Sequence, residues 1–146
     1  MGLDDKSPTL IDHVGWRLWR LARLWKAEFD GEMLRRGYLW ITEARGAIIG
    51  QLRPGGLPQS ALSTALGVSK QAVQQFVDEL VEEGAVERVV DPRDARGRIV
   101  RLTARGVAFI EEGNAVKREI ERSYARRIGK GRLEALNAAL DELAGE

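Results

Sequence analysis

The chain has 146 residues, a formal net charge of +1, an apolar fraction of 44% and a charged fraction of 31%. This length fits one domain with helical extensions, and this composition argues against both disorder and a membrane protein. No apolar run approaches the roughly 20 residues that span a bilayer, and the N-terminus has no basic segment followed by an apolar region, so we expect a cytoplasmic protein.

Several classes of chemistry are excluded by residues that the chain lacks. There is no cysteine, which excludes disulfides, thiolate nucleophiles and thiol redox sensing. His13 is the only histidine, and a lone histidine cannot form the clusters that transition-metal sites use. No phosphate-binding loop or paired catalytic constellation is present. We therefore predict no enzyme activity, no metal and no cofactor.

Apolar residues near the N-terminus predict a first helix within residues 9–36. They recur at spacings of 3 and 4, which places them in one apolar seam along the helix: Ile11, Val14, Leu18, Leu21 and Trp25. Asp30-Gly31 is expected to end or interrupt this helix. Because this apolar seam is continuous along the helix, we expect it to pack against another apolar surface.

Three more helices are predicted in the middle of the chain. Residues 39–52 form the first of them, and it stops at Arg53-Pro54-Gly55-Gly56. Pro58 starts the next, which Gly67 ends. Ser69 caps a further helix that runs to Glu83, with one apolar side made of Val73, Phe76, Val77 and Leu80. Gly84 then follows in a left-handed conformation.

After Gly84 the pattern changes to short β-branched segments. Residues 85–90 and 98–102 predict a hairpin around a turn-rich loop at 91–97. Thr103 then caps a long helix, which Gly129-Lys130-Gly131 interrupts. The last helix has an apolar seam of its own, made of Leu133, Leu136, Leu140 and Leu143.

Residues 62–73 carry a helix-turn-helix pattern. Ser63 is small enough for two helices to approach, Gly67 permits the tight turn, and Val73 seats the second helix on the first. Two helices alone would also fit a helical hairpin with no DNA role. The hairpin that follows favours a winged helix-turn-helix, in which the start of the second helix enters the major groove of DNA.

The predicted DNA contacts come from this second helix and from the hairpin, which we call the wing. On the helix they are Ser69, Lys70, Gln71, Gln74 and Gln75. Gln71 and Gln75 are the expected base readers, because glutamine can pair with adenine N6 and N7, while Ser69 and Lys70 suit phosphate. Four acidic residues later in the helix are expected to confine the contact to its first two turns: Asp78, Glu79, Glu82 and Glu83.

The wing carries most of the positive charge of the predicted DNA-binding surface. Residues 88–105 contain six arginines against two aspartates, a local balance of +4. Arg93, Arg96 and Arg98 lie at its tip and can enter a narrow minor groove, where the potential is most negative. Asp91 and Asp94 are expected to hold the loop by hydrogen bonds and by pairing with arginines. The alternative is a solvated, charged turn.

Residues 91–106, DPRDARGRIVRLTARG, closely resemble the wing signature of the MarR family of bacterial transcription regulators, and the match extends over about residues 58–106. The resemblance implies a mainly α (α+β) fold with a winged helix-turn-helix at 38–104. It also implies dimerisation helices at 9–36 and 105–146, and a homodimer on a pseudo-palindromic operator, usually as a repressor. The two apolar seams support a partner independently; closure within one monomer is the alternative.

Members of this family commonly bind small phenolic or other anionic aromatic compounds between the dimer helices and the winged helix. The cysteines of oxidant sensors and the histidines of zinc sensors are missing here, which leaves a small-molecule effector or none. Candidate effector contacts are Trp16, Trp19, Trp40 and Arg45. Tryptophans are also common in cores and interfaces. The competing hypothesis for the whole chain is a winged-helix protein-interaction module without an effector, whose wing meets an acidic protein.

Overall fold

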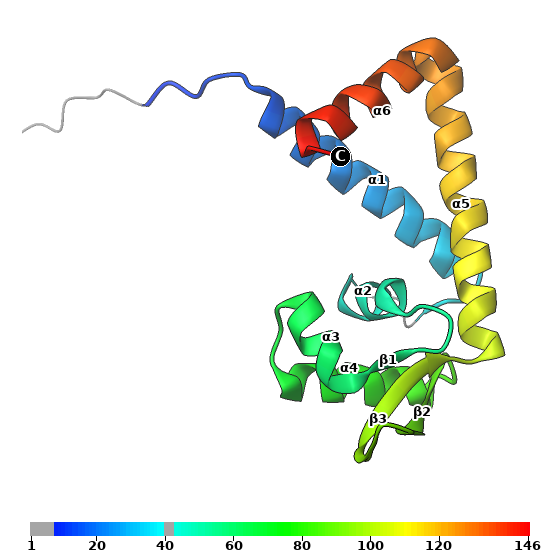
Figure 1. Ribbon diagram of the computed structural model, residues 1–146. Coiled ribbons are helices and arrows are strands. Elements are labelled where there is room, and N and C mark those ends of the chain that lie inside the picture. The colour runs from blue at the N-terminus through cyan, green and yellow to red at the C-terminus, as the bar shows by residue number, and fades with distance from the viewer. Residues whose placement is uncertain (1–7, 40–42) are drawn as a thin grey trace, which may run out of the picture.

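A computed structural model describes residues 8–39 and 43–146, so Trp40 lies outside the described residues. The elements in chain order are α1 (Val14–Arg35), α2 (Glu43–Gln51), β1 (Leu57–Pro58), α3 (Gln59–Leu66), α4 (Lys70–Glu82), β2 (Val86–Asp91), β3 (Asp94–Leu102), α5 (Ala104–Ile128) and α6 (Lys130–Ala144). α2, α3, α4 and the sheet form one compact unit, from which α1 and α5 extend (Figure 1). The predicted mainly α fold with a winged helix-turn-helix is confirmed.

α1 begins later and ends later than the sequence predicted. Its N-cap is His13, whose Nδ1 accepts the Trp16 N–H at 3.3 Å, so Ile11 of the predicted seam precedes the helix. Asp30-Gly31 does not interrupt it. The side chains of Phe29 and Met33 on either side are buried in the core, and this packing outweighs the helix cost of one glycine, about 1 kcal/mol.

The helix-turn-helix follows the prediction closely. Gly67 has φ +64°, and the Ser63 hydroxyl donates to the Val68 carbonyl at 2.7 Å, which closes the turn. The Ser69 hydroxyl accepts the Ala72 N–H at 3.1 Å and caps α4. One side of α4 is fully buried through Val73, Val77 and Leu80. The opposite side of α4 therefore faces outward.

The sheet contains a strand that the sequence did not predict. Leu57–Pro58 pairs with Val100 and Ile99 of β3 and gives the strand order β1-β3-β2, so α3 begins at Gln59 rather than at Pro58. The preceding Gly56 has φ +82°, and a Cβ there would lie 2.4 Å from the Val100 carbonyl oxygen. Only glycine fits this approach to the sheet.

The wing strands are longer than predicted. β2 and β3 pair from Val86↔Leu102 to Val90↔Arg98, and a further pair, Asp91↔Asp94, leaves residues 92–93 as the turn. Residues 95–97 have no partner on β2 and form a bulge in β3. Most of the predicted loop is therefore strand, and Arg96 projects from its bulge.

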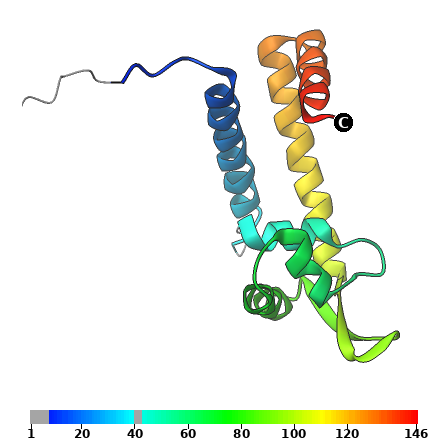
Figure 2. The same ribbon diagram turned by 60° about the vertical axis from the view of Figure 1, so that its left-hand side comes forward.

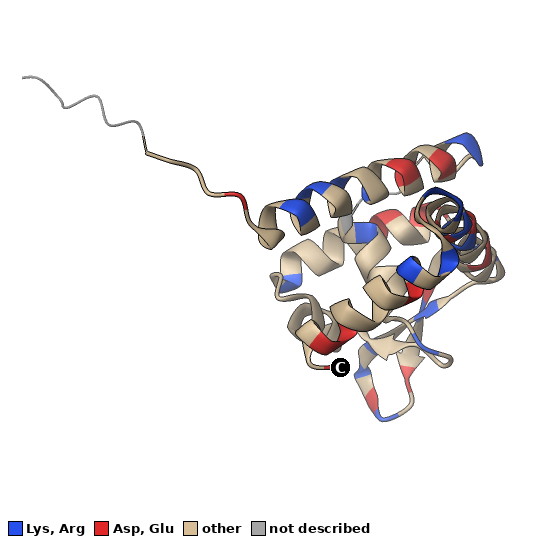
Figure 3. Ribbon diagram, turned by 90° about the horizontal axis from the view of Figure 1, so that it is seen from above, with Lys and Arg blue, Asp and Glu red and all other residues tan. Residues whose placement is uncertain are grey.

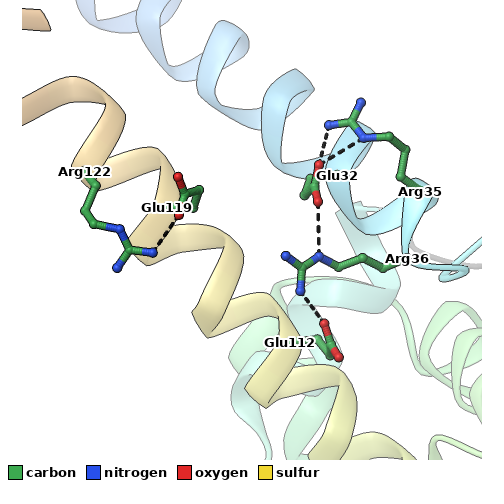
Figure 4. Close-up of polar contacts among 6 residues, drawn as sticks. All are labelled: Glu32, Arg35, Arg36, Glu112, Glu119 and Arg122. Atoms are coloured by element: carbon green, nitrogen blue, oxygen red, sulfur yellow. Dashed lines mark hydrogen bonds and ion pairs between the residues drawn. The ribbon is translucent and has the colours of Figure 1, made fainter. Parts of the chain in front are cut away.

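One of the ion pairs drawn in Figure 4 joins the end of α1 to α5. Arg36, just after α1, donates to Glu112 on α5 at 2.5 Å and to Glu32 at 3.2 Å. Hydrogen bonds from Arg35 and then Arg36 lower the pKa of Glu32, and the bond from Arg122 lowers the pKa of Glu119. The bond to Glu112 raises the pKa of Arg36. Of these contacts, the pair of Arg36 with Glu112 joins the end of α1 to α5.

Apolar side chains remain exposed where the long helices leave the winged unit. α6 leaves the far end of α5 at an angle (Figure 1), while the N-terminal part of α1 stands apart from both helices (Figure 2). The large exposed apolar residues of these helices include Val14, Trp16, Leu18, Trp19, Leu21, Leu24, Leu136 and Leu143. Within residues 8–39 and 43–146, no helix is both long and apolar enough to cross a membrane.

Candidate nucleic-acid interface

The start of α4 and the wing enclose one cleft. It has a volume of about 450 Å³, and its lining residues come from α3, α4, β2 and β3: Gln59, Ser60, Lys70, Val73, Gln74, Arg88, Arg96 and Arg98. The fold thus brings four of the predicted DNA contacts, from two separate segments, around one concave surface. No carboxylate is among the lining residues, so the cleft is suited to an anion.

The other predicted contacts lie outside this cleft. Ser69, the N-cap of α4, is exposed, as are Gln71 and Gln75 on α4 and Arg93 in the wing turn. Gln71 and Gln75 share a shallow surface of α4 with Lys70 and Gln74 and with three carboxylates, those of Asp78, Glu79 and Glu82. The helix therefore presents two adjacent surfaces, one toward the wing and one beside it.

Gln74 belongs to a closed ring of hydrogen bonds. Its Oε1 accepts from Nε2 of Gln59 at 2.6 Å, and its Nε2 donates to Asp78 at 3.1 Å. Arg88 completes the ring, with Nε on Gln59 at 2.8 Å and Nη1 on Asp78 at 2.6 Å. Both ends of the Gln74 amide are therefore occupied, unlike a glutamine that is free to read a base.

The cleft contains three polar residues that the site prediction omitted: Gln59, Ser60 and Arg88. Arg88 was visible in the charge count but not as part of a site. Gln59 and Ser60 directly follow Pro58, and nothing in their local pattern points to the wing. The one sequence feature that could have indicated Gln59 and Ser60 is their place at the start of a helix, where anions often bind.

The acidic half of α4 is largely neutralised by arginines. Asp78 pairs with Arg88 on β2, Glu79 pairs with Arg45 on α2 at 2.5 Å, and Glu83 lies 3.9 Å from Arg105 on α5. Three arginines from three elements therefore reduce the repulsion of phosphate expected from this part of α4. They also fix α4 within the unit.

The two wing aspartates hold the backbone rather than arginine side chains. Asp91 is buried, and its Oδ1 accepts the Arg93 N–H at 2.8 Å, while Asp94 accepts the Arg96 N–H at 3.0 Å. The Arg98 guanidinium turns back to the Gly97 carbonyl at 3.0 Å. Among the described residues, no acceptor contacts the guanidinium of Arg93 or Arg96, so both remain exposed for an external anion.

A second cavity lies between α1, α2 and α5. It has a volume of about 620 Å³ and a mainly apolar lining of Trp25, Lys26, Phe29, Gly46, Ala47, Ile49, Gly50, Leu52, Arg53, Pro54, Phe109, Ile110, Gly113 and Lys117. Three cations and no carboxylate belong to this lining. Stacked rings of Trp25 and Phe29, 5.4 Å apart, form one wall.

The three predicted effector residues that the structure describes, Trp16, Trp19 and Arg45, lie outside this cavity. Trp16 and Trp19 stack on each other on the exposed part of α1, with ring centroids 5.0 Å apart. The Arg45 guanidinium is directed at Glu79. Neither these tryptophans nor Arg45 line the cavity, whereas Trp25, which was assigned to the first apolar seam, does.

Comparison with known proteins agrees with this geometry. The sequence profile of the MarR family matches residues 41–97. The HTH-type transcriptional regulator PetP of Rhodobacter capsulatus is 34% identical over 77 residues, which are 53% of this chain and 46% of PetP. The segment that carries the helix-turn-helix and most of the wing therefore matches the MarR family. PetP is named as a regulator and not as an enzyme, and the chain spans about half of its length.

Solved structures extend the likeness to nearly the whole chain. The apo form of wild-type MarR from E. coli superposes with a TM-score of 0.75 at 22% identity, covering 92% of this chain and 98% of MarR. A mutant of S. aureus MepR bound to an oligodeoxyribonucleotide superposes with a TM-score of 0.68 at 21% identity, covering 92% and 98%. S. aureus MepR bound to ethidium bromide superposes with a TM-score of 0.64 at 20% identity, covering 92% of this chain and 96% of MepR. The MarR fold therefore includes α1, α5 and α6 as well as the matched segment.

Proposed function

We propose that the chain is a homodimeric, sequence-specific DNA-binding transcription regulator, and that it acts as a repressor on a pseudo-palindromic operator. The observation that carries the proposal is the cleft between α4 and the wing, where Lys70, Arg96 and Arg98 converge without a carboxylate. Gln71 and Gln75 are exposed beside it for base reading. MepR, which shares this fold, has been solved with an oligodeoxyribonucleotide.

A second copy of the chain is the proposed occupant of the exposed apolar face of α1 and α6. Charge supports this pairing as well as apolarity. Residues 14–26 of α1 contain four basic and no acidic residues. By contrast, every charged residue between Arg132 and residue 146 is acidic (Figure 3). A two-fold dimer would place these oppositely charged ends together, and its two winged units would meet half-sites about 10 base pairs apart.

Arg96→Ala is expected to weaken binding to any duplex, because it removes a phosphate or minor-groove cation without disturbing the core. The slope of log affinity against log salt should fall by about one per protomer. Fluorescence anisotropy with a labelled random-sequence duplex at several salt concentrations measures this slope. Gln71→Ala is the matched comparison: it should alter sequence preference and leave the slope unchanged.

The competing function, a protein-interaction module, makes the opposite prediction for the same measurement. If the parent protein does not bind a random duplex even at low salt, the DNA proposal is wrong. If Gln71→Ala and Arg96→Ala both merely unfold the protein, their assigned roles are wrong. Thermal unfolding followed by circular dichroism provides that check.

We further propose that a small aromatic anion binds in the cavity between α1, α2 and α5 and releases DNA. Phe29 and Trp25 offer a flat apolar wall, and Lys117 lies with its Nζ 5.8 Å from the Phe29 ring. Lys26 is paired with Asp30 at 2.5 Å, which leaves Arg53 and Lys117 as the cations for a carboxylate. Trp16 and Trp19 are assigned instead to the dimer face.

Gly50→Leu is expected to abolish binding of a planar anion such as 2-naphthoate. A Cβ at Gly50 meets no atom within 4 Å, so the leucine side chain can enter the cavity without strain. Leucine also favours a helix over glycine by roughly 0.8 kcal/mol. The melting temperature with and without 2-naphthoate, and with its uncharged amide, measures binding. Gly50→Ala should keep the response; an equal response in Gly50→Leu would place the ligand elsewhere.

A further inference from the structure

Arg45 of α2 directs its charge at α4. Its Nε lies 2.6 Å from Oε2 of Glu79, and Nη2 lies 2.5 Å from the same oxygen. The Arg45 side chain is 23% exposed and that of Glu79 is 30% exposed, so the pair is screened less than a surface pair. Glu79 is thus held in one place by a neighbouring helix.

The other oxygen of Glu79 reaches a predicted base reader. Oε1 accepts from Nε2 of Gln75, one turn earlier on α4, at 3.4 Å. A carboxylate can only accept, so the amide nitrogen of Gln75 must face Glu79. The amide oxygen therefore points away from Glu79, and the second N–H has no acceptor within the part of the chain that the structure describes.

This orientation is the one that reads adenine. The amide oxygen of a glutamine accepts from adenine N6, and one N–H donates to N7. Because Glu79 takes only one of the two N–H groups of Gln75, both base contacts remain possible while the amide is held. An oriented side chain loses less rotamer freedom on binding than a free one.

We propose that Arg45 is a positioning residue that determines sequence preference at the base read by Gln75, acting through Glu79. The inference rests on the proposed DNA-binding function. Without Arg45, Glu79 loses the contact that orients it. The Gln75 amide can then rotate and present either its oxygen or its N–H groups to the base. The preference at one base position in each half-site then falls.

Selection of duplexes from a randomised library by the full-length protein tests this role. Gln75→Ala identifies the base position that Gln75 reads, where preference should fall about tenfold. Arg45→Ala should lower the base preference at the same position by a similar factor. The double variant should lose no more of that preference than Gln75→Ala alone. Arg45→Lys, which keeps the charge but not the two-point contact, should retain part of the preference.

Arg105→Ala is the matched control, because Arg105 also faces an acidic residue of α4 but lies 3.9 Å from it, near the end of the helix. It should leave the preference at the Gln75 position unchanged. If Arg45→Ala lowers affinity equally for all sequences and keeps that preference, Arg45 only neutralises charge and the proposal is overturned.

Two further outcomes are also decisive. If Gln75→Ala leaves every preference intact, the base-reading role of α4 at Gln75 fails, and the inference fails with it. If only Arg45→Ala leaves preference intact, the function stands and the inference alone fails. Should Arg45→Ala not fold, Glu79→Gln breaks the same ion pair from its other end, and an unchanged preference in that variant overturns the inference.

Discussion

Gly106→Ala is expected to destabilise the folded protein by roughly 3 kcal/mol, although alanine normally favours a helix over glycine by about 1 kcal/mol. A Cβ at this position would lie 2.1 Å from the Ala85 carbonyl oxygen. That carbonyl accepts the Thr103 N–H at 3.1 Å, and the Thr103 hydroxyl caps α5 through the Gly106 N–H. The substitution therefore forces apart the junction between the wing and α5.

Gly113→Ala is the matched control in the same helix. A Cβ at Gly113 would lie 3.6 Å from the Phe29 ring, an ordinary contact, so its effect should stay within about 1 kcal/mol. Urea unfolding at one fixed protein concentration, followed by far-UV circular dichroism, measures both midpoints. Equal midpoints for the two variants would contradict the prediction, because they would mean that α5 can move away from the Ala85 carbonyl without loss of stability.

Leu21→Asp is expected to convert the proposed dimer to monomers and to weaken binding to a two-half-site duplex by about a hundredfold. Leu21 lies on α1 and is 41% exposed in the single chain, within the apolar face assigned to the second copy. A carboxylate buried there without a partner costs several kcal/mol. Loss of the second winged unit removes the gain from simultaneous binding, which is commonly a factor of about 100 or more.

Val81→Asp places the same charge on an apolar site of similar exposure, 38%, but on α4 of the winged unit. Sedimentation velocity should show a dimer for this control and a monomer for Leu21→Asp. A dimer in both variants would show that the face of α1 is not the dimer contact. Thermal unfolding of the isolated variants separates dissociation from unfolding.

Local signals were sufficient to predict α4 and its surroundings from the sequence. A capping serine at 69, a left-handed glycine at 84 and buried residues at helical spacing placed α4 within one residue of its observed ends. The capping threonine at 103 and the break at Gly129 did the same for α5. These signals are short-range, so no tertiary information was needed.

What the sequence could not predict depends on contacts between distant residues. β1 is two residues long and contains a proline, so it exists only because β3 lies beside it. The pair of Arg45 with Glu79 spans 34 positions and has no periodic trace. The cavity wall is made by Trp25 rather than Trp16 or Trp19, because the side of α1 that meets α5 is set by packing that no single helix reveals.

α2 lies between two cavities. Ala47 lines the cavity of about 620 Å³ and also a smaller one of about 370 Å³, formed with Ala44, Leu66, Val68 and Phe76. α2 is thus a wall one helix thick with unfilled volume on two sides, whereas α4 is held by arginines from three elements. α2 carries Arg45 and also buries Ile48 and Ile49 in the core, so an occupant of the larger cavity would press on the helix that holds Arg45 against Glu79.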